Sequence, residues 1–511
     1  MTGGTRTPAL MLLGTGSDVG KSLLVAGLCR LFTRRGLTVR PFKPQNMSNN
    51  AAVTPDGGEI GRAQALQARA CGVQPSRHMN PVLLKPQTDV GSQVVVQGEV
   101  LANATARDYF RLKKSLLPRV LDSFHTLSAG ADLVLIEGAG SAAEVNLRAS
   151  DIANMGFAEA ADVPVVLVGD IDRGGVLAQV VGTHALLPEP ERARIKGYLI
   201  NKFRGDPSLF DPALDIVTDR TDWPSFGVVP WFNGARALPA EDAMALDQRA
   251  GPGHDGAPVT VAILRLSRVA NFDDFDPLAA EPDVALTWVQ PGEAVPGNAD
   301  IVIIPGSKAT LADLAFLRAQ GWDVDIAAHL RRGGRVVGIC AGYQMLGRMV
   351  RDPEGIEGPP GEAPGLGLLD VDTVMRGPKT LREAAGTEAG TGLSVAGYEM
   401  HMGVTEGPDR ANPWLTLDGS GPDGAVSADG RVRGCYLHGL FGADAFRRRL
   451  LGLGEDDGAL DYAAGVEAAL DALADHLAAS VDVDALACAA GISVSAAARP
   501  ETATASTPEA G

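Results

Sequence analysis

The chain has 511 residues and a formal net charge of −17, with 62 acidic residues against 45 Lys and Arg. One hydrophobic core does not grow to this size, so we expect two or three domains. The acidic balance argues against a nucleic-acid partner. Apolar runs are too short for a membrane span and the N-terminus lacks a signal-peptide core, so we expect a cytoplasmic protein with no membrane partner.

Strand-like apolar runs alternate with helical patterns over residues 9–232, which predicts a doubly wound parallel α/β sheet. The runs fall at 37–42, 133–136, 163–168, 197–200 and 226–229. Residues 233–258 are rich in Gly, Pro and Asp without periodicity, so we predict a linker there. A second alternation starts at Val259 and predicts another α/β domain over 259–450. A helical extension is expected at 451–495 and a disordered tail at 496–511.

The first run ends in a small-residue loop that closes on Gly-Lys-Ser, typical of a phosphate-binding loop before a helix. Its residues Gly14, Thr15, Gly20, Lys21 and Ser22 are predicted to bind the nucleotide. Backbone N–H groups would hold the phosphates, the lysine would reach the terminal phosphates, and the Ser22 hydroxyl would contact magnesium. The usual first glycine of this motif is a threonine here.

Acidic and amide residues follow the later strands of the same domain. Ligands lie at the carboxyl edge of such sheets, so Glu137 is predicted to hold magnesium together with Ser22. Asn201 and Lys202 end another strand, where a purine edge is often recognised. Asp170 is a candidate for metal or substrate, or equally for a helix cap.

The segment after residue 42 is unusually polar. Lys43, Gln45 and Asn46 are predicted to hydrogen-bond a polar substrate near the phosphates. Asp56 and Glu59 come shortly after them and are further candidate metal ligands.

The second domain contains a Gly-Ile-Cys-Ala-Gly turn between an apolar strand and a helix. Such a nucleophile elbow presents one side chain in a cleft, and here that side chain is the Cys340 thiol. Ala341 supplies one backbone N–H for an oxyanion, and Gly306 or Ser307 the other. A thiol needs a base, and two histidines, His401 and His438, each end a later strand-like run. Their sequence setting alone does not separate them.

A phosphate loop and an activated thiol in one chain suggest a division of labour. One site makes an acyl phosphate, and the other supplies the nucleophile that captures it.

Several motifs in order resemble the cobyric acid synthase family, the glutamine-dependent ligases of cobalamin biosynthesis. They are MLLGTGSDVGKS, FKPQNMSNN, DGGEIGRAQALQA, MNPVLLKP, LIEGAGSAAEVNL, GDIDRGG, INKFRGD, PGSKAT, GICAGYQMLG, GYEMHMG and YLHGLF. The resemblance implies a dethiobiotin synthetase-like first domain and a class I glutamine amidotransferase second domain. It points to His438 as the partner of Cys340. Gly439 and Leu440 replace the usual Pro and Glu, so we expect no carboxylate as third member of a triad.

The resemblance also implies a reaction. Members of the cobyric acid synthase family amidate the b, d, e and g carboxylates of adenosylcobyrinic acid a,c-diamide, using glutamine, ATP and Mg²⁺. Alternatives are the synthase that amidates the a and c carboxylates of the same ring, another glutamine-dependent amidoligase such as one acting on a cell-wall lipid precursor, or a partitioning ATPase without amidation. The sequence leaves the oligomeric state open.

Overall fold

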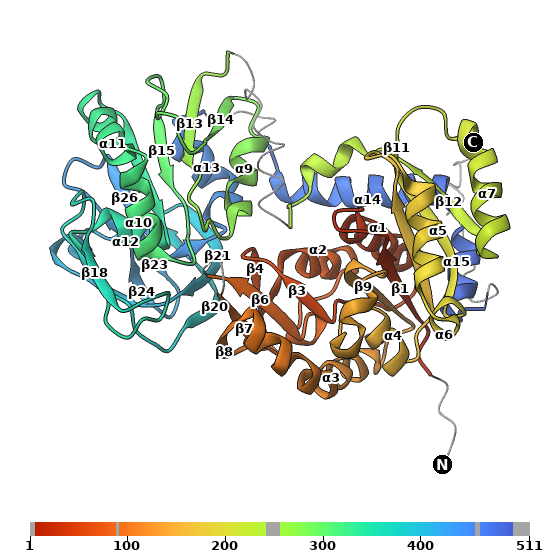
Figure 1. The fold of residues 1–511 in the computed structure, drawn as a ribbon. Helices are drawn as coiled ribbons and strands as arrows, with labels where there is room; N and C mark the ends of the chain where they lie inside the picture. Colours follow the sequence, from red (N-terminus) through yellow and green to blue (C-terminus); the bar gives the residue numbers. More distant parts are fainter. Residues whose placement is uncertain (1–5, 88–90, 242–255, 455–459, 494–511) are drawn as a thin grey trace, which may run out of the picture.

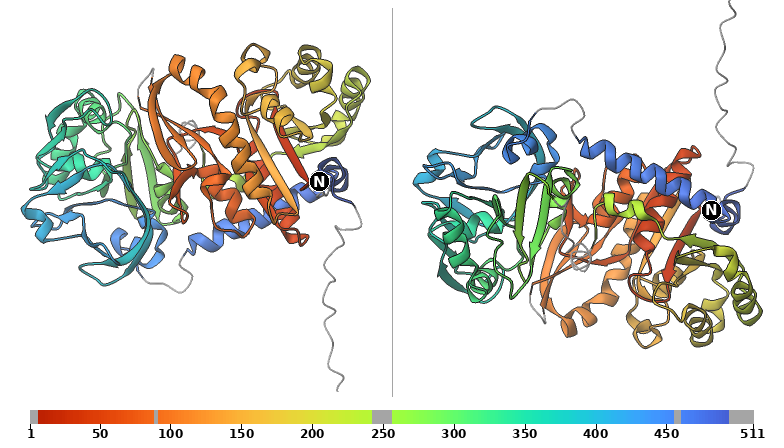
Figure 2. Two further views of the ribbon diagram at one scale, coloured as in Figure 1. Left: turned by 90° about the horizontal axis from the view of Figure 1, so that it is seen from below. Right: turned by 90° about the horizontal axis from the view of Figure 1, so that it is seen from above.

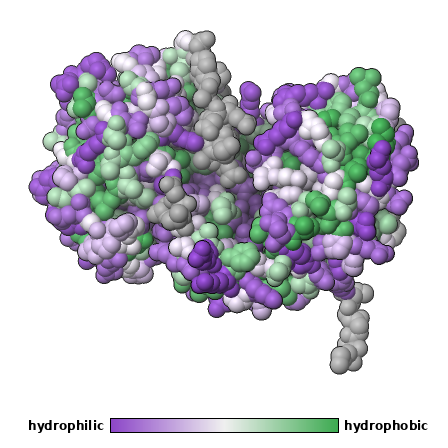
Figure 3. All heavy atoms as spheres, in the orientation of Figure 1, coloured by the Kyte–Doolittle hydropathy of each residue, from purple (hydrophilic) through white to green (hydrophobic). Residues whose placement is uncertain are grey.

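The structure is a computed structural model that describes residues 6–87, 91–241, 256–454 and 460–493. Two lobes lie side by side, and a long helix near the C-terminus returns from the second lobe to the first (Figure 1). The further views show the same arrangement from below and above (Figure 2). The face between the lobes is hollowed and its floor is hydrophilic (Figure 3). The predicted tail at 496–511 lies outside the described residues.

The first lobe is built on a parallel six-stranded sheet of order β12-β11-β10-β1-β9-β2, which confirms the predicted fold class. Its strands are β1 (Ala9–Gly14), β2 (Val39–Phe42), β9 (Leu133–Ser141), β10 (Val165–Asp170), β11 (Ile195–Phe203) and β12 (Ser225–Pro230). The helices between them are α1 (Lys21–Arg34), α2 (Arg62–Ala70), α3 (Ala106–Ser128), α4 (Met155–Ala160), α5 (Val176–Leu186), α6 (Glu189–Arg192) and α7 (Asp211–Thr221).

Alternate residues of β1 face two different helix layers, because side chains alternate across a strand. Met11 and Leu13 belong to the core that includes α3 and α4, and Leu10 and Leu12 to the core that includes α1. Burial on both faces explains why these strands read as continuous apolar runs.

A smaller sheet of the first lobe faces the second lobe. It has the order β3-β6-β7-β8, and a separate hairpin pairs β4 with β5. The bounds are β3 (Gln45–Met47), β4 (Ala51–Thr54), β5 (Gly58–Gly61), β6 (Val82–Pro86), β7 (Gly91–Val96) and β8 (Glu99–Thr105). One buried cluster joins Ala51, Val53 and Leu83 of this region to Tyr398 and Met400 of the second lobe.

The second lobe has a central sheet of order β14-β13-β15-β16-β26-β25, parallel except for the last pair. Its elements are β13 (Val259–Leu264), α9 (Asp276–Ala280), β14 (Val284–Val289), β15 (Ile301–Ile304), α10 (Thr310–Ala319), α11 (Trp322–Arg331), β16 (Arg335–Ile339), α12 (Ala341–Leu346), β25 (Ala425–Val426), β26 (Val432–Cys435) and α13 (Asp444–Leu451).

Two further sheets complete this lobe, with the orders β18-β17-β19-β22 and β24-β23-β20-β21-β27. Their strands are β17 (Met349–Asp352), β18 (Gly361–Pro364), β19 (Asp372–Val374), β20 (Thr380–Glu388), β21 (Ser394–His401), β22 (Val404–Glu406), β23 (Leu415–Leu417), β24 (Gly421–Asp423) and β27 (Leu437–His438). Short 3₁₀ helices that matter below are η4 (Asn233–Ala237) and η5 (Phe272–Phe275).

The C-terminal helices α14 (Tyr462–Ser480) and α15 (Val483–Ala490) pack on the first lobe. Gly27 of α1 permits close approach, since a Cβ atom there would lie 2.5 Å from Leu477 Cδ1 of α14. Arg34 pairs with Asp475 at 2.8 Å across the same contact. The chain therefore crosses between the lobes twice.

No helix in the described ranges is long and apolar enough to cross a bilayer.

Candidate active sites

The predicted phosphate loop joins β1 to α1, and its residues Gly20, Lys21 and Ser22 line one cavity, whereas Gly14 and Thr15 do not. Gly14 has no room for a side chain, because a Cβ there would lie 2.6 Å from the Gly16 carbonyl oxygen. Gly20 has φ +93°, which favours glycine. Lys21 donates to the carbonyl oxygens of Gly16 at 3.3 Å and Gly140 at 3.1 Å. Burial lowers the pKa of Lys21, and Glu137 partly opposes the shift. A cation enclosed by backbone groups suits a phosphate ligand.

Thr15 and Ser22 are at opposite ends of this loop. The Thr15 N–H donates to the Val168 carbonyl at 2.9 Å, and its hydroxyl to Gln179 at 3.0 Å. The Ser22 hydroxyl faces the cavity.

The buried carboxylate of Glu137 and the partly buried carboxylate of Glu241 meet at Ser22. Its hydroxyl oxygen lies 2.7 Å from Glu137 Oε1 and 2.6 Å from Glu241 Oε2. Lys43 contacts both acids, at 2.7 Å from Glu137 and 2.9 Å from Glu241. Burial lowers the pKa of Lys43, but the two carboxylates outweigh this and the net shift is upward. Two carboxylates and a hydroxyl are hard oxygen donors of the kind that Mg²⁺ prefers, so the residues fit this ion.

Glu241 was missed in the sequence because it lies inside the predicted linker 233–258. The chain after β12 forms η4 and then runs back to the loop, where Glu241 joins the cavity. Its surroundings in the sequence show neither a strand nor a motif, so no local signal indicates this role.

Two amide side chains of α2 hydrogen-bond to the Glu137 carboxylate. Gln67 donates to Glu137 Oε2 at 2.7 Å and Gln64 to the same oxygen at 3.4 Å. Both amide side chains are fully buried.

The predicted substrate residues divide into two groups. Lys43 and Asn46 line the cavity, and Asn46 donates to Glu241 at 2.9 Å. Gln45 is directed elsewhere, since its amide oxygen accepts from the Tyr109 hydroxyl at 2.8 Å.

Asn201 and Lys202 brace the phosphate loop. Asn201 donates to the Val19 carbonyl at 2.8 Å, and Lys202 donates to the Asp18 carbonyl at 2.5 Å. Lys202 also pairs with Asp170 at 2.8 Å, so this acid is part of the same brace. These contacts explain why polar residues lie near the end of strand β11.

The structure places the predicted metal ligands Asp56 and Glu59 in contacts with other side chains, outside the phosphate-loop cavity. Glu59 is fully buried and paired with Lys85 at 2.6 Å and with Lys379 at 2.5 Å. Burial alone would raise the pKa of Glu59, but the lysines more than reverse the shift. Asp56 accepts from the Ser76 hydroxyl at 2.7 Å. Among the described residues no cluster of three or more acidic, His or Cys side chains has metal-site geometry.

Cys340 lies at the predicted elbow between β16 and α12. Its φ of 54° and ψ of −109° place it in strained backbone, as expected for a nucleophile elbow. The flanking glycines are needed for packing: a Cβ on Gly342 would lie 2.0 Å from the Ile304 carbonyl oxygen, and one on Gly338 would lie 2.6 Å from the Gly342 carbonyl carbon. The turn therefore presents the Cys340 thiol and has no room for a side chain at positions 338 and 342.

His438 is oriented by a carboxylate, which corrects the prediction that no third member exists. Its Nδ1 lies 2.6 Å from Asp274 Oδ2, and the other oxygen of that acid accepts from the Gly439 N–H at 2.8 Å. Burial lowers the pKa of His438, but Asp274 and the neighbouring Cys340 raise it to about 10. Asp274 comes from η5, far upstream, and the motif around His438 contains no trace of it.

His401 has a different setting. Its ring stacks on Tyr436 with centroids 3.8 Å apart, and its Nε2 lies 3.7 Å from Glu399. In the described part of the chain His401 Nδ1 has no hydrogen-bond partner, and its neighbouring carboxylate, Glu399, lies at 3.7 Å, whereas Asp274 lies at 2.6 Å from His438 Nδ1. The geometry therefore separates the two histidines that the sequence left equivalent.

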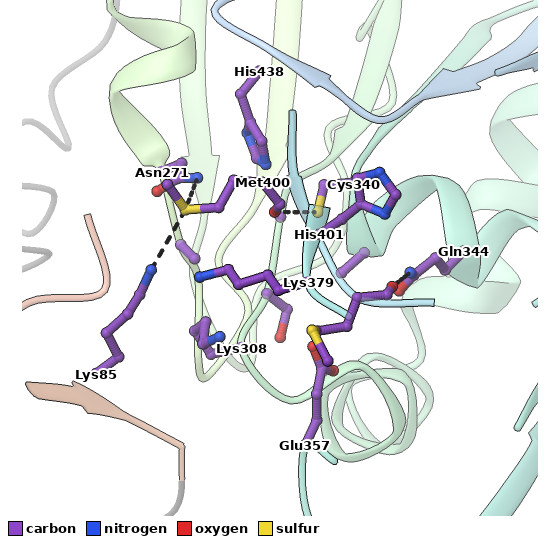
Figure 4. A pocket seen from close by; sticks show the side chains of 15 residues that line it. Lys85, Asn271, Lys308, Cys340, Gln344, Glu357, Lys379, Met400, His401 and His438 are labelled. Atoms are coloured by element: carbon purple, nitrogen blue, oxygen red, sulfur yellow. Dashed lines mark hydrogen bonds between the residues drawn. The ribbon is translucent and has the colours of Figure 1, made fainter. Parts of the chain in front are cut away.

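One cavity contains the thiol, both histidines and residues from both lobes (Figure 4). Gly306, Ser307 and Ala341 line it, and a Cβ on Gly306 would lie 3.2 Å from His438 Cε1, so the backbone predicted for the oxyanion site is beside the base. Lys85 enters from β6 of the first lobe (Figure 4). The first lobe thus forms part of the wall of this cavity.

Comparison with known proteins identifies a family for each lobe. Residues 10–244 match the CobQ/CobB/MinD/ParA nucleotide binding domain, and residues 260–446 match the CobB/CobQ-like glutamine amidotransferase domain. A protein named cobyric acid synthase from Rhodobacter capsulatus is 64% identical over 93% of this chain and 98% of its own length. Proteins of the same name from Paracoccus denitrificans and a Caulobacter species are 63% and 61% identical, over 94% and 95% of this chain and 98% and 100% of their own lengths.

Proposed function

The chain belongs to the cobyric acid synthase family, and from this premise we propose that it amidates the b, d, e and g carboxylates of adenosylcobyrinic acid a,c-diamide. The product would be adenosylcobyric acid, an intermediate of cobalamin biosynthesis, with one glutamine and one ATP used for each amide. The observation that carries the proposal is the pairing in one chain of a phosphate-loop cavity with a Cys340–His438–Asp274 site.

Glutamine would be hydrolysed in the second domain. The Cys340 thiolate attacks the side-chain amide carbon, and the carbonyl oxygen takes negative charge beside the N–H groups of Ala341 and Gly306. Imidazolium at His438 gives its proton to the departing nitrogen, so ammonia leaves and a glutamyl thioester remains. Water then attacks the thioester, His438 takes its proton, and glutamate leaves. The raised pKa of His438 keeps this proton available at neutral pH.

A carboxylate would be activated in the first domain. Ammonia does not displace oxide from a carboxylate, but it displaces phosphate from an acyl phosphate. The loop from Gly14 to Ser22 holds the phosphates of ATP, and Lys21 balances charge on the phosphoryl group during transfer. Lys43 and Asn46 line the same cavity and are the candidates to orient the carboxylate.

Magnesium is part of this proposal because its donor set fits. Ser22, Glu137 and Glu241 would hold the ion, and when bound it would neutralise phosphate charge during transfer. Gln64 and Gln67 keep Glu137 in place for that role.

Ammonia has to reach the first domain without becoming ammonium in bulk water. The thiol cavity is enclosed and is lined by Lys85 of the first lobe, which supports transfer between the lobes.

Mass spectrometry of the product tests the substrate. The protein is incubated with ATP, Mg²⁺, glutamine and adenosylcobyrinic acid a,c-diamide, and the carboxyl groups converted to amides are counted. Conversion of all four remaining peripheral carboxylates supports the proposal. A parallel reaction contains cobyrinic acid without the a and c amides, and amidation of that substrate alone would identify the earlier synthase instead.

A further inference from the structure

Arg62 is the first residue of α2 in the nucleotide-binding lobe, yet its side chain lies against the second lobe. Its Nε is 2.9 Å from Asp273 Oδ2, and its Nη2 donates to the Tyr398 hydroxyl at 2.6 Å. The ion pair is protected from solvent, since the two side chains are 15% and 12% exposed. Nη2 also donates to the Ala51 carbonyl at 2.8 Å, and a largely buried guanidinium held by an acid, a hydroxyl and a carbonyl is a rigid contact.

Both partners of Arg62 are direct neighbours of the catalytic histidine. Asp273 precedes Asp274, whose carboxylate accepts from His438 Nδ1. Tyr398 stacks on the His438 imidazole, with ring centroids 5.2 Å apart and planes 16° apart. Arg62 therefore contacts the residue that precedes the orienting acid and the ring that stacks on the face of the imidazole.

The charge of Arg62 also acts on Asp273 and so separates its role from that of the adjacent Asp274. Burial raises the pKa of Asp273, Arg62 opposes this, and nearby Asp274 adds to the rise, giving about 6. Without Arg62 the Asp273 carboxyl would lose the cation with which it pairs, and His438 would remain as a nearby positive charge. The Asp273 carboxyl would then compete with Asp274 for His438.

The same helix reaches the nucleotide site. Gln64 and Gln67 follow Arg62 by less than two turns, and both donate to Glu137 beside the phosphate loop. Helix α2 lies in Figure 1 between the phosphate-loop helix α1 and the strands that face the second lobe. One rigid element therefore contacts the metal-binding acid and the environment of the glutaminase histidine.

We propose that Arg62 is a positioning residue for His438, supplied by the nucleotide-binding lobe, so that glutamine is hydrolysed efficiently only when α2 is docked on the second lobe. This inference rests on the proposed function, because it assumes that His438 serves in glutamine hydrolysis.

The test compares glutamate release by purified full-length Arg62→Met with that of the wild type. A misplaced base slows the chemical step, so we expect kcat to fall about 100-fold. The KM for glutamine should change less than about threefold, because Arg62 does not line the cavity. Arg62→Lys keeps the charge for Asp273 but not the forked geometry, so it should recover part of the loss.

Arg69→Met is the matched control. Arg69 is on the same helix but pairs with Glu467 of α14 at 2.7 Å, away from the thiol cavity. It should release glutamate at the wild-type rate. Amide synthesis from ammonium salt, which bypasses the thiol site, should be retained by the Arg62 variants and shows that the first lobe is folded.

Two results would overturn the inference: wild-type kcat for glutamate release in Arg62→Met, or an equal fall in Arg69→Met. If Arg62→Met does not fold, Tyr398→Phe carries the test, since it removes only the hydroxyl that Arg62 contacts. Its kcat should then fall about tenfold, and an unchanged value would contradict the proposal. Full glutamate release by Cys340→Ser would instead refute the proposed function itself.

Discussion

The two chemical sites of this chain are assembled in different ways. In the first lobe the predicted phosphate-loop residues Gly14 to Ser22 are contiguous, and distant residues add carboxylates and amides around the cavity that part of the loop lines. In the second lobe Cys340, His438 and Asp274 come from three separate segments, and Arg62 of the other lobe contacts their neighbours. The first site is organised by a loop and the second by tertiary and interlobe packing. We therefore expect the second to be more sensitive to changes outside its motif.

The largest expected effect comes from breaking the loop-built site. Lys21→Ala should eliminate amidation from both glutamine and ammonium, because acyl phosphate formation needs the cation at the phosphoryl group. Glutamate release should continue in part, since the thiol lies in the other lobe. Corrinoid amide and glutamate are measured separately in each reaction. Sustained ATP-dependent amidation by this variant would refute the phosphate-loop assignment.

Breaking the packed site should affect only one nitrogen source. Cys340→Ser should lose glutamine-dependent synthesis by about 10³-fold or more, because the nucleophile and its partners act as a unit. Synthesis from high ammonium salt should persist. An equal loss with both nitrogen donors would mean that Cys340 has a structural role.

Asp274→Asn sharpens the comparison, because this acid is the part of the site that the sequence hid. Glutamate release should fall about 10²- to 10⁴-fold through loss of orientation and of the ion pair. The pKa of His438 is raised to about 10, so its protonated form, needed to expel ammonia, persists until the pH approaches that value. The alkaline limb of the pH–rate profile should therefore move to lower pH in the variant.

The raised pKa of His438 also makes the stability of the fold depend on pH. Because the folded pKa of His438 lies above its ordinary value near 6.5, pairing with Asp274 stabilises the fold fully below that value. The contribution disappears as the pH rises through about 10.

In the kinetic experiment, an unchanged alkaline limb of the pH–rate profile in Asp274→Asn would show that Asp274 does not set the protonation of His438.

The sequence predicted contiguous features well. The parallel sheet, the phosphate loop and the cysteine elbow follow from local patterns, because a strand, a tight turn and a helix in order have few alternatives. The glycines on either side of Cys340 marked the elbow in the sequence. The structure shows why a glycine is needed at position 342: a Cβ there would collide with Ile304.

What the sequence did not reveal depends on chain segments that meet only in the folded protein. Glu241 lies in a stretch without periodicity, and Asp274 lies far upstream of the histidine it orients. The lysine partners of Glu59 were also hidden, because an acid after a glycine turn looks the same whether a metal or two lysines neutralise it. Only the positions of Lys85 and Lys379 distinguish these cases.

A smaller effect is expected at this interlobe ion cluster. Glu59→Gln leaves two buried lysines without their carboxylate and should lower the free energy of unfolding by about 3 kcal/mol. Urea denaturation measures the change, with Asp56→Asn as the control at an exposed acid, where we expect less than about 1 kcal/mol. Magnesium affinity should be unchanged in both variants. Weaker Mg²⁺ binding in Glu59→Gln would restore the metal-ligand interpretation.

The smallest effect is expected at the second histidine. His401 stacks on Tyr436 and has no carboxylate partner of the kind that Asp274 provides to His438. His401→Ala should therefore be labelled at Cys340 by a glutamine-analogue electrophile at nearly the wild-type rate, and His438→Ala much more slowly. The opposite order would exchange the roles of the two histidines.

The central claim is that nitrogen freed at Cys340 is used at the phosphate-loop site of the same chain. Wild-type protein is given the a,c-diamide substrate, ATP, Mg²⁺ and amide-15N glutamine at neutral pH, together with unlabelled ammonium at a concentration that yields no product without glutamine, and the corrinoid product is analysed by mass spectrometry. We expect 15N in all the new amides, because ammonia released at Cys340 would pass between the lobes without mixing with the solvent. Product carrying mainly unlabelled nitrogen would contradict it.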